Sequence, residues 1–162
     1  MNELPRSLKV VTVWLLAGLA VFLGVQALLA QQRSTRFEVQ GELVQIRRAA
    51  DGHYHWPATV NGVSVDFLID TGATRSALPM GLVRQLKLPS EGTVRSQTAG
   101  GTAHGEVVRA ELVLQGGVRI ERLPIVALPA LGSPLLGMDV LGKLAWKQSD
   151  GVLSIDLRRG SR

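Results

Sequence analysis

The chain has no cysteine among its 162 residues, and aromatic side chains make up only 4%. Without cysteine it can form neither a disulfide nor a thiolate nucleophile or metal ligand. The formal charge is +5, but the basic residues are scattered, and no basic run is longer than Arg47-Arg48 or Arg158-Arg159. Nucleic-acid binding normally needs a clustered basic surface, often with aromatic side chains for stacking. We therefore expect a solvated basic surface and no nucleic-acid partner.

The sequence offers no convincing metal site either. His53 and His55 could supply half of one, but no third and fourth ligands cluster with them in the sequence. We expect no metal and no cofactor.

A long apolar run occupies residues 10–30, where 21 residues carry no charge. At about 1.5 Å per residue a helix of this length reaches across a bilayer core of about 30 Å. A signal peptide is the rival interpretation, with Arg6 and Lys9 as its basic region and a cleavage site near 27–30. The run is longer than the usual signal core of about 7–15 residues, so we predict an uncleaved transmembrane anchor.

The orientation of this anchor is harder to predict. More basic residues follow the run than precede it, which by count alone would place the following domain in the cytoplasm. Short basic N-terminal tails usually stay inside, however, and long domains translocate regardless of charge. We predict a single-pass inner-membrane protein with a periplasmic domain, organised as tail 1–9, anchor 10–30, linker 31–44 and domain 45–160.

Within that domain the pattern is almost entirely β. Asn61-Gly62 predicts a tight hairpin turn, and 149–151 predicts another. Further strands are expected at 107–114, 118–126 and 135–136, and short helices at 81–88 and 138–144. Many short strands with frequent Gly and Pro turns indicate a small closed β barrel.

One of the predicted strands runs into a reactive carboxylate. Val63, Val65, Phe67 and Ile69 alternate with polar residues, and Asp70-Thr71-Gly72-Ala73 follows at once. A bare Asp-Thr-Gly is common turn chemistry, because Asp and Gly are frequent turn formers. Here an apolar strand precedes it, which makes a functional carboxylate the better interpretation.

Two segments together resemble a known family. Residues 67–73 (FLIDTGA) resemble the active-site motif of aspartic proteases, and 134–141 (PLLGMDVL) resemble the apolar-apolar-Gly strand and helix of retropepsin-like, retroviral-type proteases. Their order and spacing also fit, over roughly residues 45–160. The chain is thus identified as resembling membrane-anchored bacterial retropepsin-like aspartic proteases, which implies an all-β closed barrel with one short C-terminal helix.

The resemblance also implies a mechanism. Such enzymes hydrolyse peptide bonds with water held between two carboxylates, one ionised and one protonated. This chain carries the motif once, so the resemblance implies a C2 homodimer in which each subunit contributes Asp70. Thr71 would bond to the partner's loop, Gly72 would supply an amide towards the carboxylates, and Ala73 would leave room beside the cleft.

The family covers its cleft with a mobile hairpin flap, for which residues 97–106 are in the expected place. Gly100, Gly101 and Gly105 would make this segment flexible, and His104 is expected to be exposed. Asp139 departs from an apolar pattern and is expected to cap the short helix. Whether it approaches Asp70 stays open.

Two other functions compete with peptide hydrolysis. A catalytically silent retropepsin fold could serve as a dimerisation or peptide-binding module at the membrane. A basic membrane-surface adaptor would account for the apolar run and the charge, but it leaves 67–73 unexplained. The intact Asp70 motif favours a peptidase acting on a peptide or protein substrate whose sequence cannot be predicted.

Overall fold

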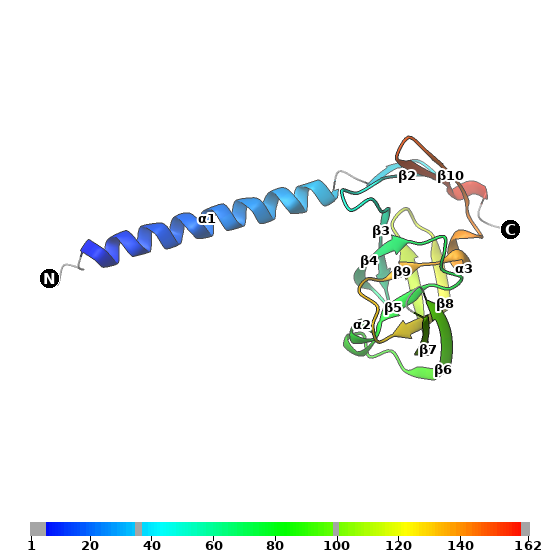
Figure 1. Cartoon of the computed structure of the whole chain (residues 1–162). Helices are drawn as coiled ribbons and strands as arrows, with labels where there is room; N and C mark the ends of the chain where they lie inside the picture. Colours follow the sequence, from blue (N-terminus) through cyan, green and yellow to red (C-terminus); the bar gives the residue numbers. More distant parts are fainter. Residues whose placement is uncertain (1–5, 35–36, 99–100, 160–162) are drawn as a thin grey trace. The chain divides into compact units, whose positions relative to one another are not determined.

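The computed structural model describes residues 6–34, 37–98 and 101–159 and divides into two compact units, Met1–Arg36 and Phe37–Arg162 (Figure 1). Helix α1, Arg6–Ser34, forms the first unit and contains the predicted anchor. Over the stretches that the structure describes, however, no helix has the length and apolar character needed to cross a membrane. The predicted anchor over 10–30 therefore has no support from the structure.

The two ends of the second unit form one antiparallel sheet in the order β1-β2-β11-β10. Its strands are β1 (Phe37–Gln40), β2 (Leu43–Arg47), β10 (Ala145–Ser149) and β11 (Val152–Asp156). Alternate residues of the two central strands face the core, because Ile46 pairs with Leu153 and Val44 with Ile155, and all four are buried. The predicted linker 31–44 is thus too long, since it overlaps β1 and the start of β2.

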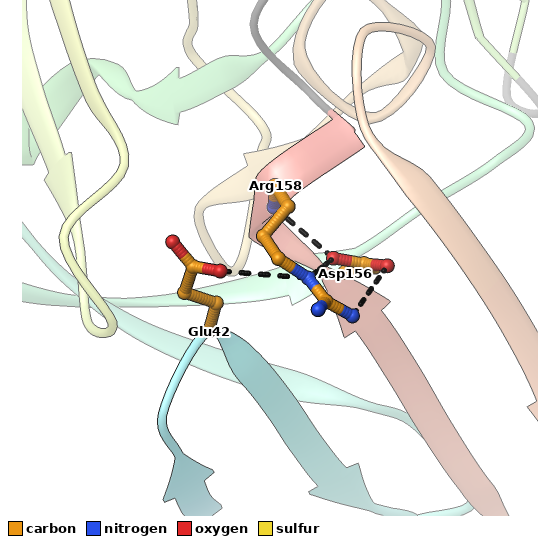
Figure 2. A network of polar contacts seen from close by, with 3 residues as sticks. All are labelled: Glu42, Asp156 and Arg158. Carbon is orange, nitrogen blue, oxygen red and sulfur yellow. Dashed lines mark hydrogen bonds and ion pairs between the residues drawn. The ribbon is translucent and has the colours of Figure 1, made fainter.

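A polar network lies where this sheet ends, next to the 3₁₀ turn η1 (Leu157–Arg159). Figure 2 shows the guanidinium of Arg158 between Asp156, 3.2 Å away, and Glu42, 3.4 Å away. The hydrogen bond to Asp156 is the main cause of a raised Arg158 pKa. The Arg158 and Glu42 side chains are largely exposed and that of Asp156 is 25% exposed, so the network adds little stability.

The remaining strands form a sheet in the order β3-β4-β9-β5-β8-β7-β6, and a further pairing of β3 with β7 closes it into a barrel with β6 outside the ring. They are β3 (His55–Val60), β4 (Val63–Ile69), β5 (Ala77–Pro79), β6 (Ser90–Thr98), β7 (Gly101–Leu114), β8 (Arg119–Leu128) and β9 (Leu135–Leu136). Short helices α2 (Met80–Gln85) and α3 (Met138–Leu141) follow β5 and β9 (Figure 1). The prediction of a mostly β closed barrel is confirmed.

Local turn chemistry places most of these strands. Asn61 and Gly62 both have positive φ, 48° and 82°, as a type I′ turn requires, and they join β3 to β4. Asp150 and Gly151 do the same between β10 and β11, so both predicted hairpins are confirmed. Helices were predicted at 81–88 and 138–144, but both are shorter than expected.

The core holds β4 in place. Val65 and Phe67 are buried, and Ile69 packs against the core at partial exposure, as the alternating pattern predicts. Val63 is the exception, since it lies 49% exposed beside the turn. A well-packed strand of this kind fixes the direction in which the chain leaves at Asp70.

Candidate active site

Asp70 lies immediately after β4 and is held by the strands on each side. The amide of Ile69 donates to the Tyr54 carbonyl at 2.9 Å, and the amide of Asp70 donates to the Leu136 carbonyl at 3.0 Å. The second bond continues the parallel pairing of β4 with β9. The Asp70 side chain is half-buried. Its backbone is therefore fixed to the barrel while its carboxylate keeps access to solvent.

The next residues turn back on this carboxylate. The amide of Gly72 donates to Asp70 Oδ1 at 2.8 Å, and the amide of Ala73 donates to the Asp70 carbonyl at 3.3 Å. A Cβ added at Gly72 would lie 3.2 Å from Asp70 Oδ1, tighter than ordinary contact. Glycine thus leaves the space in which an amide can approach the carboxylate closely. The catalytic role that the resemblance implies for Gly72 stays a prediction.

Backbone hydrogen bonds fasten the loop to the start of α3. Met138 donates to the Ala73 carbonyl at 2.8 Å, and Asp139 donates to the Thr74 carbonyl at 3.1 Å. A Cβ added at Gly137 would lie 2.5 Å from the carbonyl carbon of Arg75. The two segments predicted to belong together, 67–73 and 134–141, therefore meet with no space for a side chain between them.

The side chain of Asp139 also holds this loop, which corrects a prediction. No side chain caps α3, and the N-cap residue is Gly137. Asp139 Oδ1 instead accepts hydrogen bonds from the Ser76 amide at 3.0 Å and the Ser76 hydroxyl at 2.8 Å. The Ser76 Oγ in turn accepts a bond from the Gly137 amide at 3.1 Å. Sequence reasoning missed Ser76, since nothing local marks it as different from any other serine.

Thr71 is exposed and lines a small cavity of about 90 Å³ beside the Asp70 loop. The other lining residues come mainly from β10, β11 and α3, and they are Tyr54, Ile69, Leu141, Trp146, Gln148, Leu153 and Ile155. The Tyr54 hydroxyl is buried and has no hydrogen-bond partner among the described residues. The indole of Trp146 is 37% exposed and donates to the Leu141 carbonyl at 3.2 Å.

The described residues of the predicted flap, 97–98 and 101–106, lie in the paired strands β6 and β7. These strands pair from Ser90 with Val108 to Thr98 with Gly101, and Gly100 lies outside the described residues. Gly101 begins β7 with φ +104°, and His104 is exposed, as predicted. Gly105 is buried instead of flexible, because an added Cβ would lie 2.5 Å from the Ala127 carbonyl oxygen of β8.

The histidine pair forms a separate polar group. His55 lies between two carboxylates, with Nε2 at 2.8 Å from Asp51 and Nδ1 at 3.2 Å from Asp66. The His53 amide donates to Asp51, which is the main cause of a lowered Asp51 pKa. In the portion of the chain that the structure covers, no three acidic, histidine or cysteine side chains are arranged to hold a metal ion.

Comparisons with known proteins agree with this geometry. A family model described as aspartyl protease matches residues 56–140, just over half of the chain. Among solved structures, a retropepsin-like aspartic protease from Rickettsia conorii is 27% identical, with a TM-score of 0.58, and the match covers 72% of this chain and 99% of that one. The EIAV protease, solved with the inhibitor HBY-793, is 19% identical over 57% of this chain and 88% of that one, with a TM-score of 0.51, and shares the fold. No protein of curated function matches the sequence.

The chain therefore belongs to the aspartyl protease family. Its barrel has the retropepsin-like fold, with Asp70, Thr71, Gly72 and Ala73 following β4 inside the matched region.

Proposed function

We propose that the chain is an aspartic endopeptidase in which two Asp70 carboxylates, one from each subunit of a homodimer, activate the water that attacks a peptide bond. The observation that carries the proposal is the fixed position of Asp70. Its backbone is bonded to β9, its Oδ1 receives the Gly72 amide, and its side chain still reaches solvent. A carboxylate held in this way is suited to work as an acid or base.

The requirement for a dimer follows from the number of carboxylates. Acid–base hydrolysis of this type needs two carboxyl groups around one water, of which one accepts and one donates a proton. The only other carboxylate bonded to the Asp70 loop among the described residues is Asp139, and its Oδ1 is occupied by Ser76. A second copy with two-fold symmetry supplies an identical Asp70.

The cavity beside Thr71 is consistent with such a partner. Any subunit that brings its Asp70 next to this one also approaches Thr71, the adjacent residue. There it would meet Trp146, which is partly exposed and lines the same cavity.

The experiment is cleavage of a peptide library by the full-length chain, with Asp70→Asn as the test variant. The amide keeps the size of the side chain but cannot accept a proton from water, so kcat should fall by about 10²- to 10⁴-fold. Asp66→Asn is the matched control, because Asp66 is exposed on the same strand and its carboxylate pairs with His55, away from the Asp70 loop. An Asp70→Asn protein that cleaves at the wild-type rate would overturn the proposal.

A catalytically silent dimerisation or peptide-binding module is the alternative. It predicts that wild type and Asp70→Asn bind peptides equally well and that neither cleaves them. Mass spectrometry of the library after incubation separates the two functions. If the chain is a peptidase, wild type produces new peptide termini and Asp70→Asn does not.

The cellular location stays a prediction that rests on the apolar residues 10–30. We propose an inner-membrane location with a periplasmic catalytic domain. The chain should then sediment with membranes after alkaline carbonate extraction, and protease added to spheroplasts should degrade the domain. Release of the chain by carbonate would exclude an integral anchor.

A further inference from the structure

We infer that Asp139 and Ser76 are positioning residues for Asp70. Their side chains form a hydrogen-bonded clamp that fixes the position of the loop carrying Asp70. This inference rests on the proposed function. Asp139 lies on α3 and Ser76 at the end of the loop that Asp70 begins. The clamp joins positions 63 residues apart in the sequence. It acts on Asp70 through the loop.

The clamp is built as a chain of directed hydrogen bonds. The Ser76 amide and hydroxyl both donate to Asp139 Oδ1, at 3.0 and 2.8 Å, and Ser76 Oγ accepts the Gly137 amide at 3.1 Å. Ser76 is fully buried and is the one buried polar residue among the described positions of the chain. Hydrogen bonds to a charged acceptor in such surroundings are stronger than neutral ones and restrict geometry more tightly.

The other oxygen of the same carboxylate argues against a role in folding alone. Asp139 Oδ2 is buried and has no hydrogen-bond partner among the described residues. Burial of an unpaired carboxylate oxygen is unfavourable for folding, and an apolar residue at this position would avoid that penalty. A side chain that is unfavourable for folding but fixes the loop at two points fits a site under functional constraint.

The loop is held by hydrogen bonds along its length, so a change at the clamp is transmitted to Asp70. It is bonded at Asp70 to Leu136, at Ala73 to Met138, at Thr74 to Asp139 and at Ser76 to the Asp139 side chain. Loss of the bonds to Asp139 leaves this end of the loop held by the Val126 amide, which donates to the Ser76 carbonyl at 3.0 Å, and lets Asp70 shift relative to its partner. Displacement of a reacting group by about 1 Å lowers a rate by about 100-fold.

The test measures kcat and KM separately in the full-length chain, at protein concentrations where the dimer is complete. Ser76→Ala removes the hydroxyl but keeps the amide, and Asp139→Ala removes both bonds. We expect kcat to fall about tenfold in the first and about 100-fold in the second, with KM within about twofold of wild type. Asp139→Asn keeps Oδ1 as an acceptor and should restore kcat to within about threefold of wild type.

Matched controls and a double variant sharpen the result. Ser64→Ala and Asp66→Asn change the same residue types at exposed positions and should leave kcat unchanged. Because the two groups act as one unit, the fall in kcat for Ser76→Ala combined with Asp139→Ala should be smaller than the product of the two single falls. If Asp139→Ala does not fold, Ser76→Ala and Asp139→Asn still decide the question.

Two failures can be told apart. If wild type cleaves peptides while the folded Ser76→Ala and Asp139→Ala variants keep kcat within about threefold, or lose activity through KM, the clamp is refuted and the peptidase stands. The clamp is also refuted if the effects of the two variants multiply in the double variant. If wild type cleaves nothing, the proposed function fails, and the clamp fails with it.

Discussion

Substitution of Gly137 by alanine tests how tightly the active site is assembled. Its Cβ would lie 2.5 Å from the carbonyl carbon of Arg75, 2.7 Å from the Arg75 oxygen and 2.9 Å from the Ala73 oxygen. All three are backbone atoms, so no side-chain rotation can relieve the clash. Gly137 has φ −95° and ψ −178°, an extended conformation that alanine also adopts. The penalty is therefore purely steric.

The size of the effect follows from these distances. Ordinary contact begins near 3.4 Å, so a Cβ at 2.5 Å forces residues 73–75 and α3 apart by about 0.9 Å. Overpacking of this kind costs about 1–3 kcal/mol of unfolding free energy. The movement also displaces the loop that holds Asp70, and a shift near 1 Å lowers kcat by about 100-fold.

The assay combines chemical denaturation with kcat at saturating peptide. Gly132→Ala is the matched control, because no atom lies within 4 Å of its added Cβ and its φ is outside the left-handed region. The control should fold and cleave like wild type. Wild-type kcat and stability in Gly137→Ala would show that the loop and α3 can separate freely, and the account of a tightly assembled site would be wrong.

Three further outcomes are expected. Two adjacent carboxylates share one proton, so peptide cleavage should follow a bell-shaped pH profile with its maximum at about pH 4–6, and a rate that rises steadily to pH 9 would indicate other chemistry. Specific activity should fall on dilution from micromolar to nanomolar protein as the dimer dissociates, whereas constant activity of a monomer seen by light scattering would exclude a shared site. The pKa of Asp51 is lowered from its ordinary value of 3.8, so the ionised carboxylate stabilises the fold at pH values above 3.8. This contribution to stability is lost as the pH falls below 3.8 and through the pKa of the folded state. Acid titration of unfolding free energy should therefore be less steep for Asp51→Asn than for wild type, and identical titrations would contradict the assignment.

The sequence predicted those parts of the molecule that depend on neighbouring residues. The Asn61-Gly62 turn, the alternation in β4 and the delivery of Asp70 into a turn each follow from contiguous residues, and each is found in the structure. Hydrophobic periodicity and turn residues are local signals, which explains why the predictions made from them are confirmed here. Strand β1, Phe37–Gln40, is too short to give a clear period and was included in a linker.

Contacts between distant residues could not be predicted in this way. Asp139 sits near the start of α3, where a helix cap is the commonest role for aspartate, but its actual partner Ser76 is 63 residues away. Gly105 lies among other glycines, so composition indicated flexibility, while its real constraint is the carbonyl of Ala127 on another strand. Both depend on packing that the local sequence does not encode.

The sheet that joins the two ends of the protease unit makes them one cooperative unit. Strand β11 pairs residue by residue with β2, from Val152 with Arg47 to Asp156 with Leu43. If β10 and β11 were removed, β1 and β2 would remain as a two-stranded hairpin, which is marginally stable in water. A chain broken after Ser149 loses β11 and leaves β10 without its partner strand, so it should lose order at 37–47, more than a hundred residues away. In native-state hydrogen exchange, the amides of β2 and β11 should open together at a single rate.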